Sequence, residues 1–132
     1  MKNFQKLGAI FILSFALNLV WENLHSFLYT AYQGGPITEY ILLRATLGDA
    51  VMLTILAVPF VYITALTHRL WLMVPIGVAL AVWIELYALN AGRWSYNELM
   101  PLVPFVQVGL TPTVQLALLG WVTYWYVLRR QV

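Results

Sequence analysis

The chain contains no cysteine and few charged residues. Without cysteine it forms no disulfide, presents no thiol nucleophile and offers no thiolate to an iron–sulfur cluster or haem. It also has no glycine-rich phosphate loop, serine triad or zinc-type histidine pair, which argues against nucleotide hydrolysis and proteolysis. Lys, Arg, Asp and Glu make up only 9% of the residues, which is far below the share in an ordinary soluble domain.

Hydrophobic residues take the place of the missing charge. They make up 62% of the 132 residues, and the mean hydropathy of +0.80 predicts a polytopic membrane protein. This length accommodates about four spans of ~20 residues. We therefore expect an all-α fold, with residues 1–132 forming a single four-helix transmembrane domain. The pI near 9.0 rests on few charges, so it indicates membrane topology, and we expect no nucleic-acid partner.

Apolar runs and turn residues place the expected spans at about 7–29, 38–66, 70–90 and 111–130. We expect Pro59 to kink the second span. Thr111 and Pro112 look like the N-cap and first helical residue of the last span. The segment 91–110 is too apolar for a solvated loop and too rich in proline and glycine for a span. It is therefore predicted to be interfacial or re-entrant, with a passive loop lying on lipid as the alternative.

The basic residues predict the orientation of the chain. Most of them fall on one side of the expected spans, and Arg44 and Arg93 lie on or near the other. The residues of the first group are Lys2, Lys6, Arg69, Arg129 and Arg130. The positive-inside rule then places both termini in the cytoplasm. In that orientation most polar residues within the spans lie in the outer halves, which predicts one polar cavity open outward or to the outer leaflet.

The first span carries the sharpest polar pattern. Asn18, Glu22, His25 and Tyr29 are four, three and four residues apart, so they share one face of a helix. An ionisable residue in a span costs about 2.5–3.5 kcal/mol on insertion scales, which suggests that such residues are used or paired. Glu22 and His25 are read as an acid–base pair. Alternatively, they only satisfy each other or join helices by hydrogen bonds.

The same Glu-x-x-His spacing is also used in helical di-metal sites. A di-iron bundle needs the motif twice, and this chain has it once. We therefore expect no metal and no cofactor, and a metal site at Glu22 and His25 is kept as an alternative.

Asp49 and Glu85 are the other two candidate catalytic carboxyl groups. Asp49 lies five residues after Arg44 and so on a different helix face, which predicts that Arg44 pairs with another span or with a lipid phosphate. Asp49 either faces the cavity or forms an interhelical salt bridge. Arg93 and Trp94 either line the site or anchor the chain at the membrane interface. The side-chain amides of Asn18, Asn90 and Gln115 either bind substrate or join helices through hydrogen bonds. The candidate substrate-binding residues are Asn18, Trp21, Tyr29, Trp83, Tyr87, Asn90, Arg93, Trp94 and Gln115.

A protonated carboxyl group beside a histidine, in an apolar pocket with aromatic faces, suits protonation of a hydrophobic substrate. The ring quadrupoles would stabilise a developing cation, and a second carboxylate would remove a proton later. The rings expected to do so are those of Trp21, Tyr29, Trp83 and Tyr87.

Part of the first span resembles a known family. Asn18-Leu-Val-Trp21-Glu22 is similar to the Asn-x-x-Trp-Glu element of integral-membrane terpene cyclases, which implies an acid role for Glu22. Those enzymes have more spans, and their second acid matches no residue of this chain. A longer pattern resembles a group of small bacterial four-span membrane proteins, which implies a multi-pass protein of the bacterial inner membrane. It comprises Trp21-Glu-x-x-His25-x-x-x-Tyr29, Leu47-Gly48-Asp49, Gly92-Arg93-Trp94-x-Tyr96-x-x-x-Met100-Pro101 and Pro112-x-x-Gln115.

These patterns lead to three hypotheses. In the first, the pocket isomerises or cyclises a lipidic, isoprenoid-like substrate, with Glu22 as the acid, His25 tuning it, and Glu85 or Asp49 as the base. In the second, the same pocket binds or transports a lipid, an ion or a metal without chemistry. In the third, the chain is a structural membrane subunit. The expected partner is a membrane lipid or hydrophobic small molecule, and a homodimer is compatible with every hypothesis.

Overall fold

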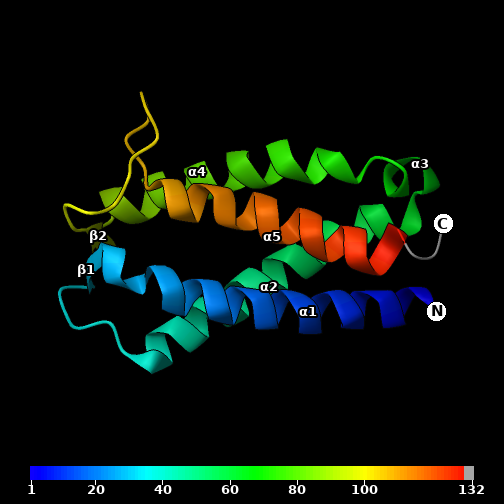
Figure 1. Cartoon of the computed structure of the whole chain (residues 1–132), viewed down its shortest axis with the longest axis horizontal. Coiled ribbons are helices and arrows are strands. Elements are labelled where there is room, and N and C mark those ends of the chain that lie inside the picture. The colour runs from blue at the N-terminus through cyan, green and yellow to red at the C-terminus, as the bar shows by residue number, and fades with distance from the viewer. Residues whose placement is uncertain (130–132) are drawn as a thin grey trace.

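The computed structural model describes residues 1–129, which form a bundle of long helices closed at one end by a small β-ribbon (Figure 1). In chain order the elements are α1 (Asn3–His25), η1 (Ser26–Leu28, a 3-10 turn), β1 (Tyr29–Tyr32), α2 (Glu39–Tyr62), α3 (Thr64–Thr67), η2 (Leu70–Leu72, a 3-10 turn), α4 (Met73–Asn90), β2 (Trp94–Tyr96) and α5 (Leu110–Leu128). The start of α1 and the end of α5 lie at the same end of the bundle, opposite the ribbon (Figure 1).

Each of the four predicted apolar segments forms a long helix, so the prediction of a mainly helical chain is confirmed. Within residues 1–129, three segments are long and apolar enough to cross a membrane, namely Asn3–Leu28, Glu39–Tyr62 and Leu70–Asn90. The fourth helix, α5, is not among them, because it mixes Thr, Gln, Trp and Tyr with its aliphatic residues. It is instead the most enclosed helix, with buried side chains along its whole length.

The expectation of an all-α fold is wrong at one end of the bundle. There β1 pairs antiparallel with β2, with Tyr29 opposite Tyr96 and Tyr32 opposite Trp94. Aromatic and β-branched residues suit these extended segments, and Gly92, with φ of 69°, turns the chain into β2. The strands are too short to produce a readable alternation in the sequence. Tyr29 lies in the ribbon and is therefore not on the helix face that it was predicted to share with Glu22 and His25.

The segment 91–110 contains β2 and a loop that lies outside the helix bundle. After β2, the loop over residues 97–109 projects sideways from the helix axes (Figure 1). Met100 and Val108 are buried at its base, whereas Phe105 is fully exposed. The loop is closed by hydrogen bonds from the Val103 amide to the Val108 carbonyl and from the Leu110 amide to the Pro101 carbonyl, each 2.7 Å long. Where this loop lies relative to a membrane, whether interfacial, re-entrant or passive on lipid, stays a prediction.

The helices pack as two pairs joined by α5. α1 packs along α2, α4 packs along α5, and contacts between α1 and α5 unite the pairs. Small residues bring α4 and α5 together, since a Cβ on Gly77 would lie 2.6 Å from the Cα of Ala117. The buried Tyr124 hydroxyl donates to the Leu53 carbonyl and ties α5 to α2. Within the described chain, α2 and α4 make almost no direct contact with each other.

Two helix ends differ from the sequence-based expectation. α2 stops at Tyr62, three residues after Pro59, so the predicted second span ends earlier than Leu66. The predicted N-cap role of Thr111 is wrong, because Gly109 is the N-cap of α5 and Thr111 lies in its first turn. Its hydroxyl is therefore free for contacts outside the helix.

Candidate functional site

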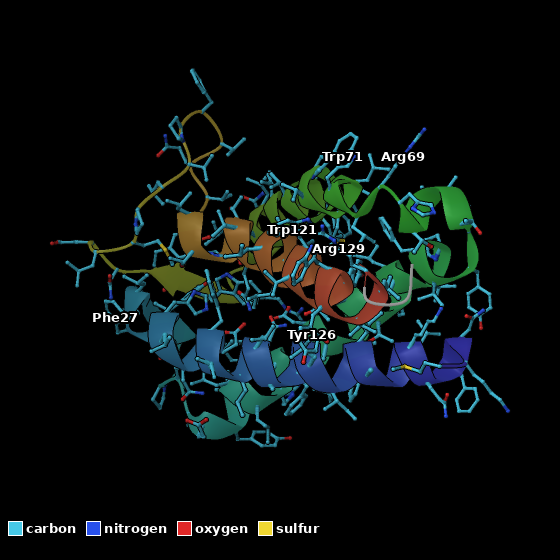
Figure 2. All side chains as sticks on the ribbon, turned by 45° about the vertical axis from the view of Figure 1, so that its right-hand side comes forward. Phe27, Arg69, Trp71, Trp121, Tyr126 and Arg129 are labelled. Atoms are coloured by element: carbon cyan, nitrogen blue, oxygen red, sulfur yellow. The ribbon has the colours of Figure 1, made fainter. Side chains whose placement is uncertain are left out.

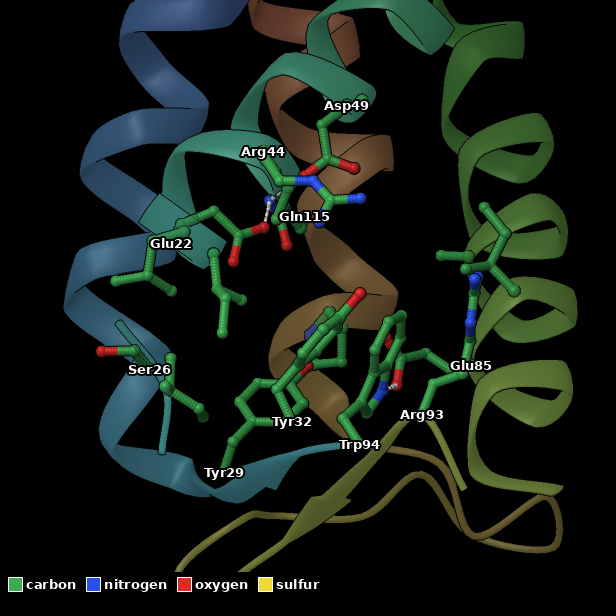
Figure 3. Close-up of a pocket in the computed structure, with 18 of the residues that line it drawn as sticks. Glu22, Ser26, Tyr29, Tyr32, Arg44, Asp49, Glu85, Arg93, Trp94 and Gln115 are labelled. Carbon is green, nitrogen blue, oxygen red and sulfur yellow. Dashed lines mark hydrogen bonds between the residues drawn. The ribbon is translucent and has the colours of Figure 1, made fainter. Parts of the chain in front are cut away.

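A cavity of about 370 Å³ lies between α1, α2 and α4, with α5 behind it and the β-ribbon at its end (Figure 3). Its volume falls in the range of small-molecule sites, roughly 300–1,000 Å³. The lining combines aliphatic and aromatic side chains with three carboxyl groups and two guanidinium groups. The polar and aromatic lining residues are Glu22, Ser26, Tyr29, Tyr32, Arg44, Asp49, Glu85, Arg93, Trp94 and Gln115.

The expected contact between Glu22 and His25 is present on one wall. His25, the last residue of α1, is buried, and its Nε2 lies 3.2 Å from Oε2 of Glu22. Its Nδ1 lies 2.9 Å from the Thr111 hydroxyl, which donates in turn to the Met100 sulfur. The hydroxyl then accepts from Nδ1, so the contact between Nε2 and Oε2 requires a proton on one partner. Glu22 and His25 thus share a transferable proton.

Gln115 of α5 connects three helices at the back of the pocket. Its amide nitrogen lies 2.8 Å from Oδ1 of Asn18, 2.9 Å from Oε1 of Glu22 and 2.9 Å from Oδ2 of Asp49. A side-chain amide has only two hydrogens for these three acceptors. If Glu22 or Asp49 carries a proton, its own hydroxyl group donates a hydrogen bond. The two amide hydrogens are then enough for the oxygens that remain. The geometry therefore favours a proton held between Glu22 and Asp49.

Glu85 of α4 provides a second carboxyl group on the opposite wall. Its Oε2 accepts hydrogen bonds from the Trp94 indole, at 2.9 Å, and from the Tyr96 hydroxyl. The Tyr96 oxygen accepts in turn from the Gly109 amide at 2.9 Å. Burial, together with the nearby Glu85, raises the pKa of Tyr96, which keeps this phenol protonated as a donor. The β-ribbon thus fixes the position of Glu85.

Tyr29 stands between the two walls. Its ring packs edge to face against His25 at 5.3 Å and against Tyr96 at 5.4 Å, measured between centroids. Burial is the main cause that raises the pKa of Tyr29, and the charge of Glu85 adds to it. Within residues 1–129 no hydrogen bond holds its hydroxyl, which is therefore available to a bound molecule.

The structure does not bring every predicted residue to the pocket. Trp83 and Tyr87 are 67% and 59% exposed on the outer face of α4, and Asn90 is exposed near its end. Two positions from Glu85 is about 200° around a helix, so Trp83 and Tyr87 must point away from it. Trp21 packs beside His25, at 6.3 Å between centroids, without lining the cavity. Asn18 lies behind the cavity and reaches it only through Gln115.

The aromatic wall is built from residues that the sequence reasoning partly missed. Tyr32 and Trp94 stack with their centroids 6.5 Å apart, next to Tyr29. Tyr32, Tyr96 and Arg44 were not among the predicted site residues. Their place depends on the ribbon and on the spacing of α2 and α4, neither of which leaves a local signal in the sequence. Among residues 1–129 no group of three or more His, Asp or Glu side chains is arranged to hold a metal ion.

Comparison with protein-family models, with curated proteins and with solved structures finds no match to this chain. The geometry of the pocket is therefore the basis for a functional proposal.

Tyr96→Phe is expected to loosen the ribbon. The change removes one donor to the buried Glu85 and the acceptor for the Gly109 amide, at about 1–3 kcal/mol for a group left unpaired. Hydrogen exchange at residues 94–110 should speed up by roughly tenfold or more. Tyr87→Phe is the matched control, because Tyr87 is exposed on the same helix as Glu85. Equal exchange in both variants would contradict the role given to Tyr96.

Proposed function

We propose that the chain is an integral membrane protein spanning the membrane four times, through α1, α2, α4 and α5. Three of these helices have the required length and hydropathy, and only 17–28% of the residues in their apolar windows are buried. The remaining faces carry many exposed Leu, Ile, Val and Phe side chains, which suit lipid. α5 has lower hydropathy but is enclosed by the others, so it needs less contact with lipid.

In this proposal both termini face the cytoplasm. α1 begins and α5 ends at one end of the bundle, which is also where Arg69, Trp71 and Arg129 lie, whereas Phe27 lies at the opposite end (Figure 2). Basic residues and interfacial tryptophans at one end support the orientation of the positive-inside rule. Arg130, which belongs to the predicted basic group, lies outside the described residues. The pocket, near the ribbon end, then opens in the outer half of the bilayer.

The proposed activity is acid–base isomerisation or cyclisation of a lipidic, isoprenoid-like substrate. One observation carries it: two carboxyl groups, Glu22 and Glu85, line opposite walls of one largely apolar pocket with different partners. Glu22 receives protons through His25 and its Asp49 neighbour, which makes it the acid. Glu85, as a carboxylate held by two donors, is placed to accept a proton.

The proposed reaction adds one proton to the substrate and removes another. The Glu22 proton adds to one carbon of a double bond, which leaves a carbocation on its neighbour. Glu85 then removes a proton from a carbon next to the cation, so the double bond shifts, the substrate keeps its composition, and one proton has moved from Glu22 to Glu85. In a cyclisation a second double bond attacks the cation before the proton is lost. The faces of Tyr29, Tyr32 and Trp94 are placed to stabilise the cation through their ring quadrupoles.

Deuterium uptake tests this proposal directly. Proteoliposomes made from a bacterial total lipid extract are incubated in D₂O, and carbon-bound deuterium in the isoprenoid fraction is measured by mass spectrometry. We expect uptake with the wild type and a loss of roughly a hundredfold or more with Glu22→Gln, in line with general acid catalysis. Trp83→Phe, on the outer face of α4, should retain full uptake. Equal uptake with Glu22→Gln would overturn the proposal, as would no uptake by folded wild-type protein.

A further inference from the structure

Two arginines line the pocket and take no part in the proton transfer just described. Arg44 comes from α2 and Arg93 from the turn between α4 and β2, so they reach the cavity from opposite sides (Figure 3). Both side chains are exposed. The backbone of Arg93 is fixed to the ribbon, because its carbonyl accepts from the Gln33 amide at 2.7 Å. The two guanidinium groups are therefore presented at the rim of the same cavity.

Neither arginine has an acidic partner within residues 1–129. Within residues 1–129 the ion pair found is that of His25 with Glu22, and the three pocket carboxyl groups are occupied by Gln115, His25, Trp94 and Tyr96. Arg44 only stacks over the ring of Tyr40, with its guanidinium carbon 5.8 Å from the ring centroid. Two guanidinium groups at one cavity, without an acidic partner in residues 1–129, can together bind an anion.

The rest of the cavity is apolar and open on one side. The cavity lies between α2 and α4, whose backbones make few close contacts with each other, and its apolar part is called the slit here. Aliphatic side chains of both helices and of α5 line it. They are Ile41, Leu42, Ala45 and Met52 from α2, Ala81 and Ile84 from α4, and Leu116 from α5. A hydrocarbon chain attached to the anion can lie along this slit.

We propose that the pocket binds a lipid phosphate monoester or diphosphate, with its headgroup held between Arg44 and Arg93 and its chain in the slit between α2 and α4. Each guanidinium can donate two parallel hydrogen bonds, so the pair offers four donors. A carboxylate or a phosphodiester has two free oxygens, whereas a phosphate monoester has three. The inference rests on the proposed function, since it names the class of substrate for that pocket.

The binding test needs no turnover. Purified protein in detergent is titrated by native mass spectrometry with farnesyl phosphate, farnesol, inorganic phosphate and phosphatidylglycerol. We expect farnesyl phosphate to bind best and to lose roughly tenfold to a hundredfold in affinity with Arg44→Gln or Arg93→Gln. Both arginines are exposed and form no ion pair with the part of the chain that the structure describes, so these variants should remain folded and monodisperse. Arg69→Gln, at the other end of the bundle, is the matched control and should bind as the wild type does.

Each alternative gives a different result. Equal binding of farnesol means that the chain alone is recognised, and equal binding of inorganic phosphate means that the lipid part is irrelevant. Equal binding of phosphatidylglycerol means that any phosphodiester lipid is accepted, and an equal loss with Arg69→Gln means non-specific attraction. Any of these overturns the inference. The binding titration involves no turnover, so a failure of the proposed chemistry is distinguishable from a failure of this site.

Discussion

Gln115→Leu should be among the most destabilising polar-to-apolar substitutions in this chain. It removes the donor shared by Asn18, Glu22 and Asp49, and leaves three acceptors without it at the point where α1, α2 and α5 meet. Unpaired buried acceptors cost about 1–3 kcal/mol each in water-soluble proteins and less between membrane helices, so we expect a loss of about 2–5 kcal/mol. Unfolding followed by tryptophan fluorescence in mixed detergent–SDS micelles would measure it.

Two comparisons make this result specific. Asn23→Leu removes an exposed amide that bonds only to its own helix, so it should cost less than about 1 kcal/mol. In an Asp49→Asn background Gln115→Leu should cost at least about 1 kcal/mol less than in the wild type, because the new amide can itself donate to Glu22. If the cost of Gln115→Leu is the same in both backgrounds, the three acceptors do not depend on Gln115 in the way described.

Gly77→Ala is expected to destabilise the bundle, against the usual trend. Replacing glycine by alanine within a helix normally stabilises it by about 0.5–1 kcal/mol. Here the new methyl group would lie 2.6 Å from both Cα and N of Ala117, and neither backbone atom can move aside alone. Forcing α4 away from α5 should cost about 1–3 kcal/mol, as overpacking does in other cores.

Gly8→Ala is the matched control for Gly77→Ala. Gly8 also lies within a helix, and a Cβ there meets nothing within 4 Å. This variant should be as stable as the wild type or slightly more so. The same unfolding assay serves both variants. A Gly77→Ala protein as stable as Gly8→Ala would show that α4 and α5 do not need their close approach.

The long helices and one contact of the site could be predicted from the sequence because their signals are local. Apolar runs bounded by Gly34, Gly35 and Pro36 mark the ends of α1 and α2, and the three-residue spacing of Glu22 and His25 places them on one face. The prediction failed where an aromatic residue near Glu85 in the sequence was expected to point into the same pocket. Trp83 lies about 200° from Glu85 around the helix, so its side chain points away from the pocket.

The rest of the site depends on contacts between distant parts of the chain. Gln115 meets Glu22 and Asp49 only because α5 packs against both α1 and α2, and no local pattern records that register. Arg44 reaches the rim of the pocket because α2 and α4 stand apart, which is a property of helix pairing. The polar residues of each span could thus be named from the sequence, whereas their partners could not.

The gap between α2 and α4 also makes the pocket mechanically soft. α2 packs along α1 and α4 along α5, and α2 and α4 are joined mainly through α5 rather than by direct contacts with each other. Lateral pressure in the proposed bilayer would narrow the gap, and tension or thinning would widen it. We expect ligand affinity to change with acyl-chain length and membrane tension even when every protein contact stays the same. The thickness of the membrane would then act as a regulator of this pocket.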